Sequence, residues 1–154
     1  MATKNSADYA ITAESLLGAG EDNTFAGVAS FMRRKYTKDV AGADAVVWGI
    51  PLDTGVTNRP GARFGPQAVR RASMILDNDP QYPFNMQLFD KMAVADYGDC
   101  HLSTNRVWEN PEKIESEAAA ILAHDCYLLS LGGDHYVTWP LLKAHAEKYG
   151  PLAL

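Results

Sequence analysis

The sequence has few cysteines and no spacing that would pair them. Only Cys100 and Cys126 occur among the 154 residues, and no C-x-x-C pair is present. Small secreted domains that depend on disulfides carry more cysteines, arranged as a framework. The count therefore excludes a disulfide-stapled scaffold, and we expect both residues to be reduced, partly buried thiols.

Long apolar runs are absent as well. The first twenty residues hold a single lysine, and their apolar stretch is interrupted by Glu14, so they lack the uninterrupted core of a secretory signal. No segment approaches the roughly 20 apolar residues that a membrane-spanning helix needs. We expect a soluble, cytoplasmic protein without a membrane partner. Residues 1–40 are expected to be an N-terminal arm, loosely ordered over its first two dozen residues.

The chain has no excess of positive charge. Lys and Arg number 14 against 19 Asp and Glu, for a net charge of −5. Nucleic-acid partners are disfavoured, because binding to phosphates relies on clustered Lys and Arg. A cationic substrate is compatible with this balance. With 47% hydrophobic and 21% charged residues, the composition is that of one ordinary globular domain.

What is present is an alternation of short apolar runs with helical patterns. The runs at 44–50, 91–96 and 126–131 read as strands buried on both faces. Helical patterns follow them. Strands and helices that alternate at this spacing predict right-handed crossovers and an α/β fold, with three αβα layers around a mainly parallel sheet.

Three helices are expected between and after these strands. The first begins at Pro66, with Ala68, Ala72 and Ile75 on its buried face and Arg70 and Arg71 opposite. The second begins with Asn110 as its N-cap, and the third spans residues 138–149. Their inward-facing residues are expected to be Ile114, Ala118, Ile121 and Leu122 in the second, and Leu141, Leu142 and His145 in the third.

The chain stops inside an apolar segment, Pro151–Leu154, that looks like the start of another buried strand. Natural domain boundaries usually fall in polar, exposed linkers. We therefore expect residues 41–154 to be the N-terminal part of a single larger domain, with a sheet that is incomplete at its C-terminal side.

Ligands of parallel sheets bind beyond the carboxyl ends of the strands, so the loops that follow strands are the candidate sites. The sharpest is Gly132–His135, which places an imidazole beside the carboxylate of Asp134. Imidazole suits Mn, Fe or Zn, and a neighbouring carboxylate can orient the ring. Taken alone, the four residues favour a hydrogen-bonded structural histidine, which is the more frequent role of a lone histidine after a strand. One His and one Asp cannot hold a metal unaided.

The loop from Asp53 to Gly65 has three glycines and two arginines and leads into a helix N-terminus, where an anion could bind. It lacks the spacing of a P-loop or a dinucleotide fingerprint. A loop that simply packs over the sheet edge is the alternative. Asp96, Asp99 and His101 follow the second predicted strand, and we favour a role in satisfying loop backbone donors over metal binding. His124 and His145 are assigned no role.

Taken together, these segments resemble the ureohydrolase family, which includes arginase, agmatinase and related guanidino-acid hydrolases. The resemblance runs from about Ala41 to Leu154 and is closest to agmatinases. It rests on four motifs in order: residues 48–53 (WGIPLD), 57–66 (TNRPGARFGP) with Arg70 following, 97–99 (YGD) and 131–135 (LGGDH).

The resemblance implies an arginase-like fold and hydrolysis of agmatine to putrescine and urea at a pair of Mn²⁺ ions. His135 would be a terminal ligand of one manganese, and Asp134 would support it without binding the metal. Asp53, Asn58 and Arg59 are candidates for the substrate loop. The family's remaining metal ligands, a D-A-H-x-D and a D-x-D motif, would follow Leu154, as would its catalytic residues, which stay unknown.

We therefore expect the family's activity from a full-length protein and no turnover from this chain alone. The resemblance also implies that the full-length protein forms a homo-oligomer. A guanidinobutyrase or related guanidino-acid hydrolase is the alternative within the family. An inactive interaction module that docks onto full-length subunits, and a small nucleotide-binding α/β protein, are the alternatives outside it.

Overall fold

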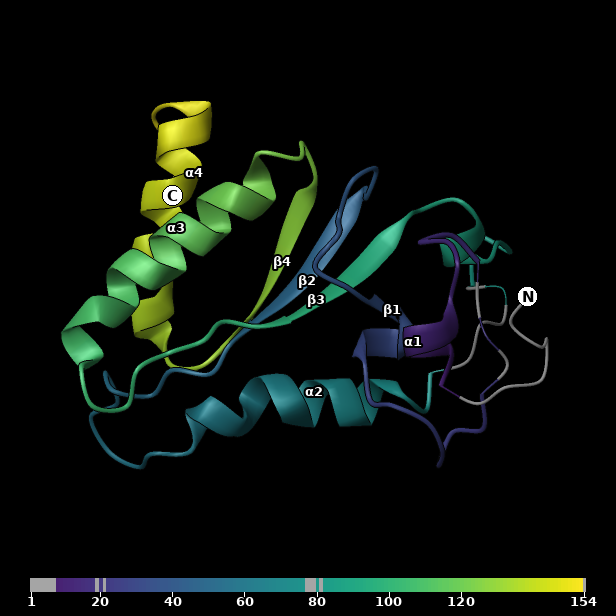
Figure 1. Ribbon diagram of the computed structural model, residues 1–154, viewed down its shortest axis with the longest axis horizontal. Coiled ribbons are helices and arrows are strands. Elements are labelled where there is room, and N and C mark those ends of the chain that lie inside the picture. Colours follow the sequence, from purple (N-terminus) through teal and green to yellow (C-terminus); the bar gives the residue numbers. More distant parts are fainter. Residues whose placement is uncertain (1–7, 19, 21, 77–79, 81, 154) are drawn as a thin grey trace.

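A computed structural model describes residues 8–18, 20, 22–76, 80 and 82–153 (Figure 1). Its centre is a sheet of four parallel strands in the order β1-β3-β2-β4. The strands are β1 Lys35–Tyr36, β2 Ala45–Ile50, β3 Val94–Asp99 and β4 Tyr127–Gly132. β2 lies between β3 and β4 and pairs with both along its length.

Helices cover both faces of this sheet. α3 (Asn110–Leu122) and α4 (Thr138–Tyr149) lie together on one face, and α2 (Gly65–Ser73) lies on the other (Figure 1). The predicted three-layer α/β class with a parallel sheet is therefore confirmed. None of the helices in the described ranges is both long and apolar enough to span a lipid bilayer. The short elements are α1 Tyr9–Thr12 and the 3-10 turns η1 Phe31–Arg33, η2 Ala62–Phe64, η3 Leu88–Asp90, η4 Val107–Glu109 and η5 His135–Val137.

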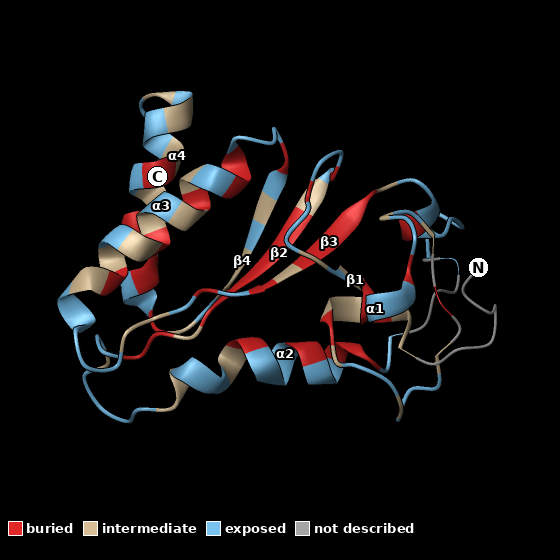
Figure 2. Ribbon diagram, in the orientation of Figure 1, coloured by how far each residue is buried: buried red, intermediate tan, exposed pale blue. Residues whose placement is uncertain are grey.

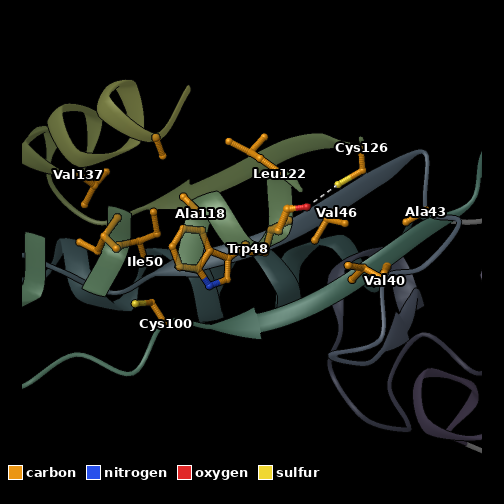
Figure 3. Packing of buried hydrophobic residues seen from close by; sticks show 14 of the residues in the cluster. Val40, Ala43, Val46, Trp48, Ile50, Cys100, Ala118, Leu122, Cys126 and Val137 are labelled. Carbon is orange, nitrogen blue, oxygen red and sulfur yellow. Dashed lines mark hydrogen bonds between the residues drawn. The ribbon is translucent and has the colours of Figure 1, made fainter. Parts of the chain in front are cut away.

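The core lies between β2 and the α3–α4 layer. Trp48 and Ile50 of β2 are fully buried and point toward Ala118, Leu122 and Val137 (Figure 3). The face of α3 predicted to be buried is confirmed, because all four of its apolar residues are at most 1% exposed. Fully burying a side chain of this size contributes about 1.5–3 kcal/mol, so this contact orients α3 on the sheet.

The cysteines are free and buried, as predicted. Burial raises the pKa of the Cys100 thiol and also that of Cys126. The Cys126 thiol donates a hydrogen bond to the carbonyl of Ile121 over 3.5 Å (Figure 3). Both residues therefore belong to the packed interior rather than to a reactive site.

The second strand begins later than predicted. It spans residues 94–99 rather than 91–96, because η3 and a turn occupy the residues before it. The Asp44 carboxylate accepts a hydrogen bond from the Ala93 amide at 2.7 Å, which sets where the pairing of β3 with β2 starts. Asp96 and Asp99 consequently lie within the strand and not in the loop after it.

The prediction for the buried face of α2 is wrong. Ala68, Ala72 and Ile75 are exposed, and Ile75 lies beyond the end of the helix. The residues facing the sheet are Pro66, Arg70 and Ser73. Figure 2 shows the buried residues of α2 on the side toward the strands. A buried arginine at this position is possible because carboxylates on β3 compensate its charge.

Two smaller predictions about helices also need correction. Asn110 is the first residue of α3 rather than its cap. Its side-chain oxygen accepts a hydrogen bond from the Ser103 amide at 2.7 Å, and its side-chain nitrogen donates to the Ser103 carbonyl at 3.0 Å. In α4 the fully buried residues are Pro140 and Ala144. The predicted Leu141, Leu142 and His145 are only partly buried.

Described residues among the first forty contact the sheet and the segment before β3. β1 pairs with β3 through Lys35 and Tyr36. The Arg34 guanidinium lies 3.6 Å from the ring centroid of Phe89 and donates to the carbonyl of Gly18. At the other end, residues 151–153 adopt no strand, and Leu154 lies outside the described residues.

Candidate functional site

The candidate loops meet at the carboxyl ends of β2, β3 and β4, where ligands of parallel sheets bind (Figure 1). The backbone joins two of them directly. The Gly133 amide donates to the Ile50 carbonyl at 3.2 Å, and the Asp134 amide donates to the Leu52 carbonyl at 2.7 Å. The Cys100 amide donates to Gly49 at 2.8 Å. All three predicted loops therefore lie side by side.

Gly133 is required by this close approach. A Cβ atom at Gly133 would lie 2.3 Å from the Leu52 carbonyl oxygen and 2.6 Å from that of Ile50. Real Cβ atoms do not approach backbone oxygens so closely, and the backbone cannot move aside as a flexible side chain could. The second glycine of the Gly-Gly-Asp-His motif thus lets the loop after β4 pack on the loop after β2.

Asp134 ties the two loops together with its side chain. It is 9% exposed. One carboxylate oxygen accepts from the Gly55 amide at 2.6 Å, and the other accepts from the Tyr136 amide at 2.9 Å and so caps η5. Its hydrogen bonds go to backbone amides, not to the ring of His135. Asp134 therefore orients His135 indirectly, by fixing the turn that carries it.

His135 opens η5 and is exposed at the carboxyl edge of the sheet. Within the described part of the chain its ring has no hydrogen-bonding or ionic partner. The turn that carries His135 is held by the side chain and the amide of Asp134, which bond to Gly55 and Leu52. An exposed imidazole on such a fixed turn can offer a nitrogen to a ligand. The predicted position of the histidine at the tip of this loop matches the structure.

The loop after β2 is ordered by Asp53. Its side chain is buried, accepts from the Gly61 amide at 2.8 Å and pairs with the Arg63 guanidinium, whose Nε lies 2.8 Å away. The hydrogen bond from Arg63 lowers the pKa of Asp53 to about 2. Asp53 therefore joins the start of the loop to Gly61 and Arg63 near its end. Asn58 and Arg59 lie between these residues and are exposed.

Asp96 and Asp99 are joined to Arg70 of α2. Arg70 donates to both oxygens of Asp96 at 2.8 and 2.9 Å and to Asp99 at 2.6 Å. Asp96 is fully buried and also accepts from the amides of Phe31 and Gly98. The prediction that these carboxylates satisfy backbone donors therefore holds for Asp96, from within the strand, whereas Asp99 accepts from the guanidinium of Arg70. The buried Arg70 was missed, and the signal that could have revealed it is the need of a buried Asp for a counter-charge.

The described residues do not by themselves fit a divalent metal. No group of three or more His, Cys, Asp or Glu side chains in the described ranges is placed to hold an ion. His135 offers one donor, and the two nearby strand carboxylates are engaged by Arg70. A divalent ion such as Mn²⁺ needs several oxygen or nitrogen donors. Additional ligands must come from elsewhere for a metal to be held at this edge.

Comparisons with known proteins agree on one relationship. The sequence profile of the arginase family matches residues 43–154. An agmatinase from Chromobacterium violaceum is 51% identical over 148 residues, covering 96% of this chain and 46% of that protein. The structure of a hypothetical agmatinase from Burkholderia thailandensis aligns with a TM-score of 0.90 at 50% identity, covering 94% of this chain and 46% of that one.

A more distant solved structure is a formiminoglutamase from Trypanosoma cruzi, crystallised with Mn²⁺. It aligns with a TM-score of 0.62 at 29% identity, over 70% of this chain and 36% of that one. The chain thus spans less than half the length of each of these relatives. This chain, with the carboxyl edge of its sheet, therefore matches only part of each of these two solved structures.

Proposed function

The chain belongs to the arginase family, and from this premise we propose that it supplies part of an agmatinase, which hydrolyses agmatine to putrescine and urea. The observation that carries the proposal is the 51% identity to an agmatinase over 96% of this chain. The activity is proposed for a protein that combines these residues with the rest of the arginase fold. The chain alone is proposed to be inactive, because it presents a single candidate metal donor.

In this proposal His135 would hold a manganese ion through one imidazole nitrogen, together with further ligands that the described residues do not supply. The Mn²⁺ in the related formiminoglutamase structure supports the choice of metal. Asp134 keeps the His135 turn at a fixed distance from the loop after β2, through its bond to the Gly55 amide. A misplaced ligand raises the barrier steeply, because hydrolysis of a resonance-stabilised guanidinium needs a precisely positioned nucleophile.

The proposal assigns substrate contact to the exposed Asn58 and Arg59, with Asp53 in a supporting role. Asp53 anchors the loop at Gly61 and Arg63 and is therefore not free to bind substrate itself. Replacing Asn58 or Arg59 with Ala should raise the KM for the guanidino substrate more than it lowers kcat. Replacing Asp53 with Asn should affect both, because the whole loop loses its internal anchor.

The test compares two purified proteins, the 154-residue chain and a version joined to the C-terminal part of its agmatinase relative. Urea release from agmatine with added Mn²⁺ is expected only from the joined protein. In that protein, His135→Ala should remove one bound manganese and lower turnover by at least about 100-fold. His124→Ala is the matched control and should keep full metal content. An unchanged rate in His135→Ala would remove this residue from the site.

The same joined protein distinguishes agmatine from other guanidino substrates. Agmatine and 4-guanidinobutyrate differ in the charge of the group at the far end of the chain. A higher kcat/KM for agmatine supports the agmatinase assignment, and a higher value for 4-guanidinobutyrate would replace it with a guanidino-acid hydrolase.

A further inference from the structure

The first turn of α2 packs directly on the backbone of the sheet at its carboxyl edge (Figure 1). A Cβ atom at Gly65, the first residue of α2, would lie 2.7 Å from the carbonyl oxygen of Gly132, the last residue of β4. A Cβ atom at Gly49 of β2 would lie 2.9 Å from the Cβ of Pro66, the second residue of α2. Glycines therefore let the start of α2 reach both β2 and β4.

Gly65 is explained by this close contact and not by its backbone conformation. Its φ of −54° and ψ of −54° are those of an ordinary helix, which any residue adopts. Alanine has the higher helix propensity. Real Cβ atoms essentially never come within 3.0 Å of another heavy atom, and the neighbour here is a backbone oxygen that cannot rotate aside as a side chain could. An alanine at position 65 would therefore force α2 and the end of β4 apart.

The helix has little freedom to give way. Arg70 of α2 donates to Asp96 at 2.8 and 2.9 Å and to Asp99 at 2.6 Å, which ties the helix to β3. The displacement is therefore expected at the end of β4. Because His135 follows Gly132 by three residues, a shift of the Gly132 carbonyl is carried into the turn that bears the imidazole.

We infer that Gly65 is a positioning residue for the His135 turn. By letting α2 begin against the Gly132 carbonyl, it sets where the chain leaves β4, while the amides of Gly133 and Asp134 hold the turn to the loop after β2. The relevance of this position to catalysis rests on the proposed function. The contact itself does not, so the two can fail separately.

Amide hydrogen exchange of the ¹⁵N-labelled 154-residue chain tests the contact without metal or substrate. In Gly65→Ala, the Asp134 amide, which donates to Leu52 at 2.7 Å, should lose about ten-fold in protection relative to the Tyr127 amide at the other end of β4. A general loss of stability would instead accelerate the exchange of both amides equally.

Gly132→Ala is the matched control. Its Cβ would meet only the Val137 side chain, at 3.5 Å, which is an ordinary contact, so the ratio of protection should stay as in the parent. An unchanged ratio in Gly65→Ala, or an equal loss in Gly132→Ala, would overturn the inference. Complete unfolding of Gly65→Ala would also overturn it, because Gly65 would then be a requirement of the whole fold rather than of one turn.

The protein joined to the C-terminal part of the agmatinase relative tests the consequence for catalysis. At equal amounts of folded enzyme, Gly65→Ala should lower kcat for agmatine about ten-fold and change KM by less than about two-fold, because a displaced His135 misplaces the reacting groups and not the substrate. Gly42→Ala, where the space is open, should keep both values. A raised KM with an unchanged kcat would remove the positioning role. Absence of urea release from the parent would overturn the proposed function and leave the exchange experiment to decide the inference.

Discussion

Arg70 offers the sharpest test of how the fold is held together. Arg70 is 5% exposed, and its guanidinium donates four hydrogen bonds, two to Asp96, one to Asp99 and one to the Gly98 carbonyl at 2.9 Å. Burial alone lowers the pKa of Arg70, but the bonds and charges of the two carboxylates raise it above its ordinary value overall. The residue therefore stays cationic at any pH at which the protein is handled.

Replacing Arg70 with Met keeps much of the side-chain volume and removes the charge. Asp96, at 0% exposure, would then hold an uncompensated carboxylate in the interior. Breaking one partner of a buried pair costs about 3–5 kcal/mol, which is a large part of the roughly 5–15 kcal/mol that stabilises a typical domain. With a urea m value of about 2 kcal/mol per M, the unfolding midpoint should fall by about 2 M.

Urea denaturation followed by circular dichroism measures this shift. Arg71→Met is the matched control, because Arg71 is the exposed neighbour on the same helix and should change stability by no more than about 0.5 kcal/mol. Adding Asp96→Asn to Arg70→Met should recover part of the loss, since it removes the stranded charge. A midpoint for Arg70→Met within about 0.5 M of the parent would refute the reasoning.

Two further predictions concern the loops at the carboxyl edge. In thermal unfolding, Gly133→Ala should lower stability by more than about 2 kcal/mol, because the new methyl group would meet the backbone oxygens of Leu52 and Ile50. Gly42→Ala is the control, because the space around Gly42 is open. It should lose only about 1 kcal/mol, from the positive φ at that position. The pKa of Asp53 is lowered from 3.8 to about 2, so the stability it contributes is complete above pH 3.8 and is lost as the pH falls toward 2. Between about pH 5 and about pH 2.5 the parent should therefore lose more stability than Asp53→Asn, and parallel losses in urea midpoints would contradict an ionised Asp53 in the folded loop.

Local pattern was enough to predict several elements. The strand at Ala45–Ile50 and the buried face of α3 follow from apolar residues at a spacing that only one secondary structure can bury. The position of His135 at a loop tip follows equally from a strand that ends at Gly132 and is followed by a second glycine. The four family motifs could be recognised for the same reason, since each lies within a few consecutive residues.

Tertiary contacts decided what the local pattern could not. The α2 face was mispredicted because the burial of Arg70 depends on Asp96, 26 residues further along the chain. The start of β3 depends on Asp44, 49 residues before Ala93. Asp134 reaches an amide 79 residues away at Gly55, so its part in fixing the loop after β2 could not be deduced from its own neighbours.

The surface between α3 and α4, which is lined by Trp108, Glu112, Trp139 and Glu147 among others, is the clearest case of this division. Along the sequence, Glu112, Glu147 and Trp139 look like ordinary exposed residues of their own helices, and Trp108 like an exposed residue of the turn η4. Only the packing of the two helices on one face of the sheet brings Glu112 and Glu147 to the same concave surface. Periodicity identified the buried face of α3, because its apolar residues recur at the spacing of one helical face. Charge pairing and concavity depend on distances between segments far apart in the chain, and these exist only once it has folded.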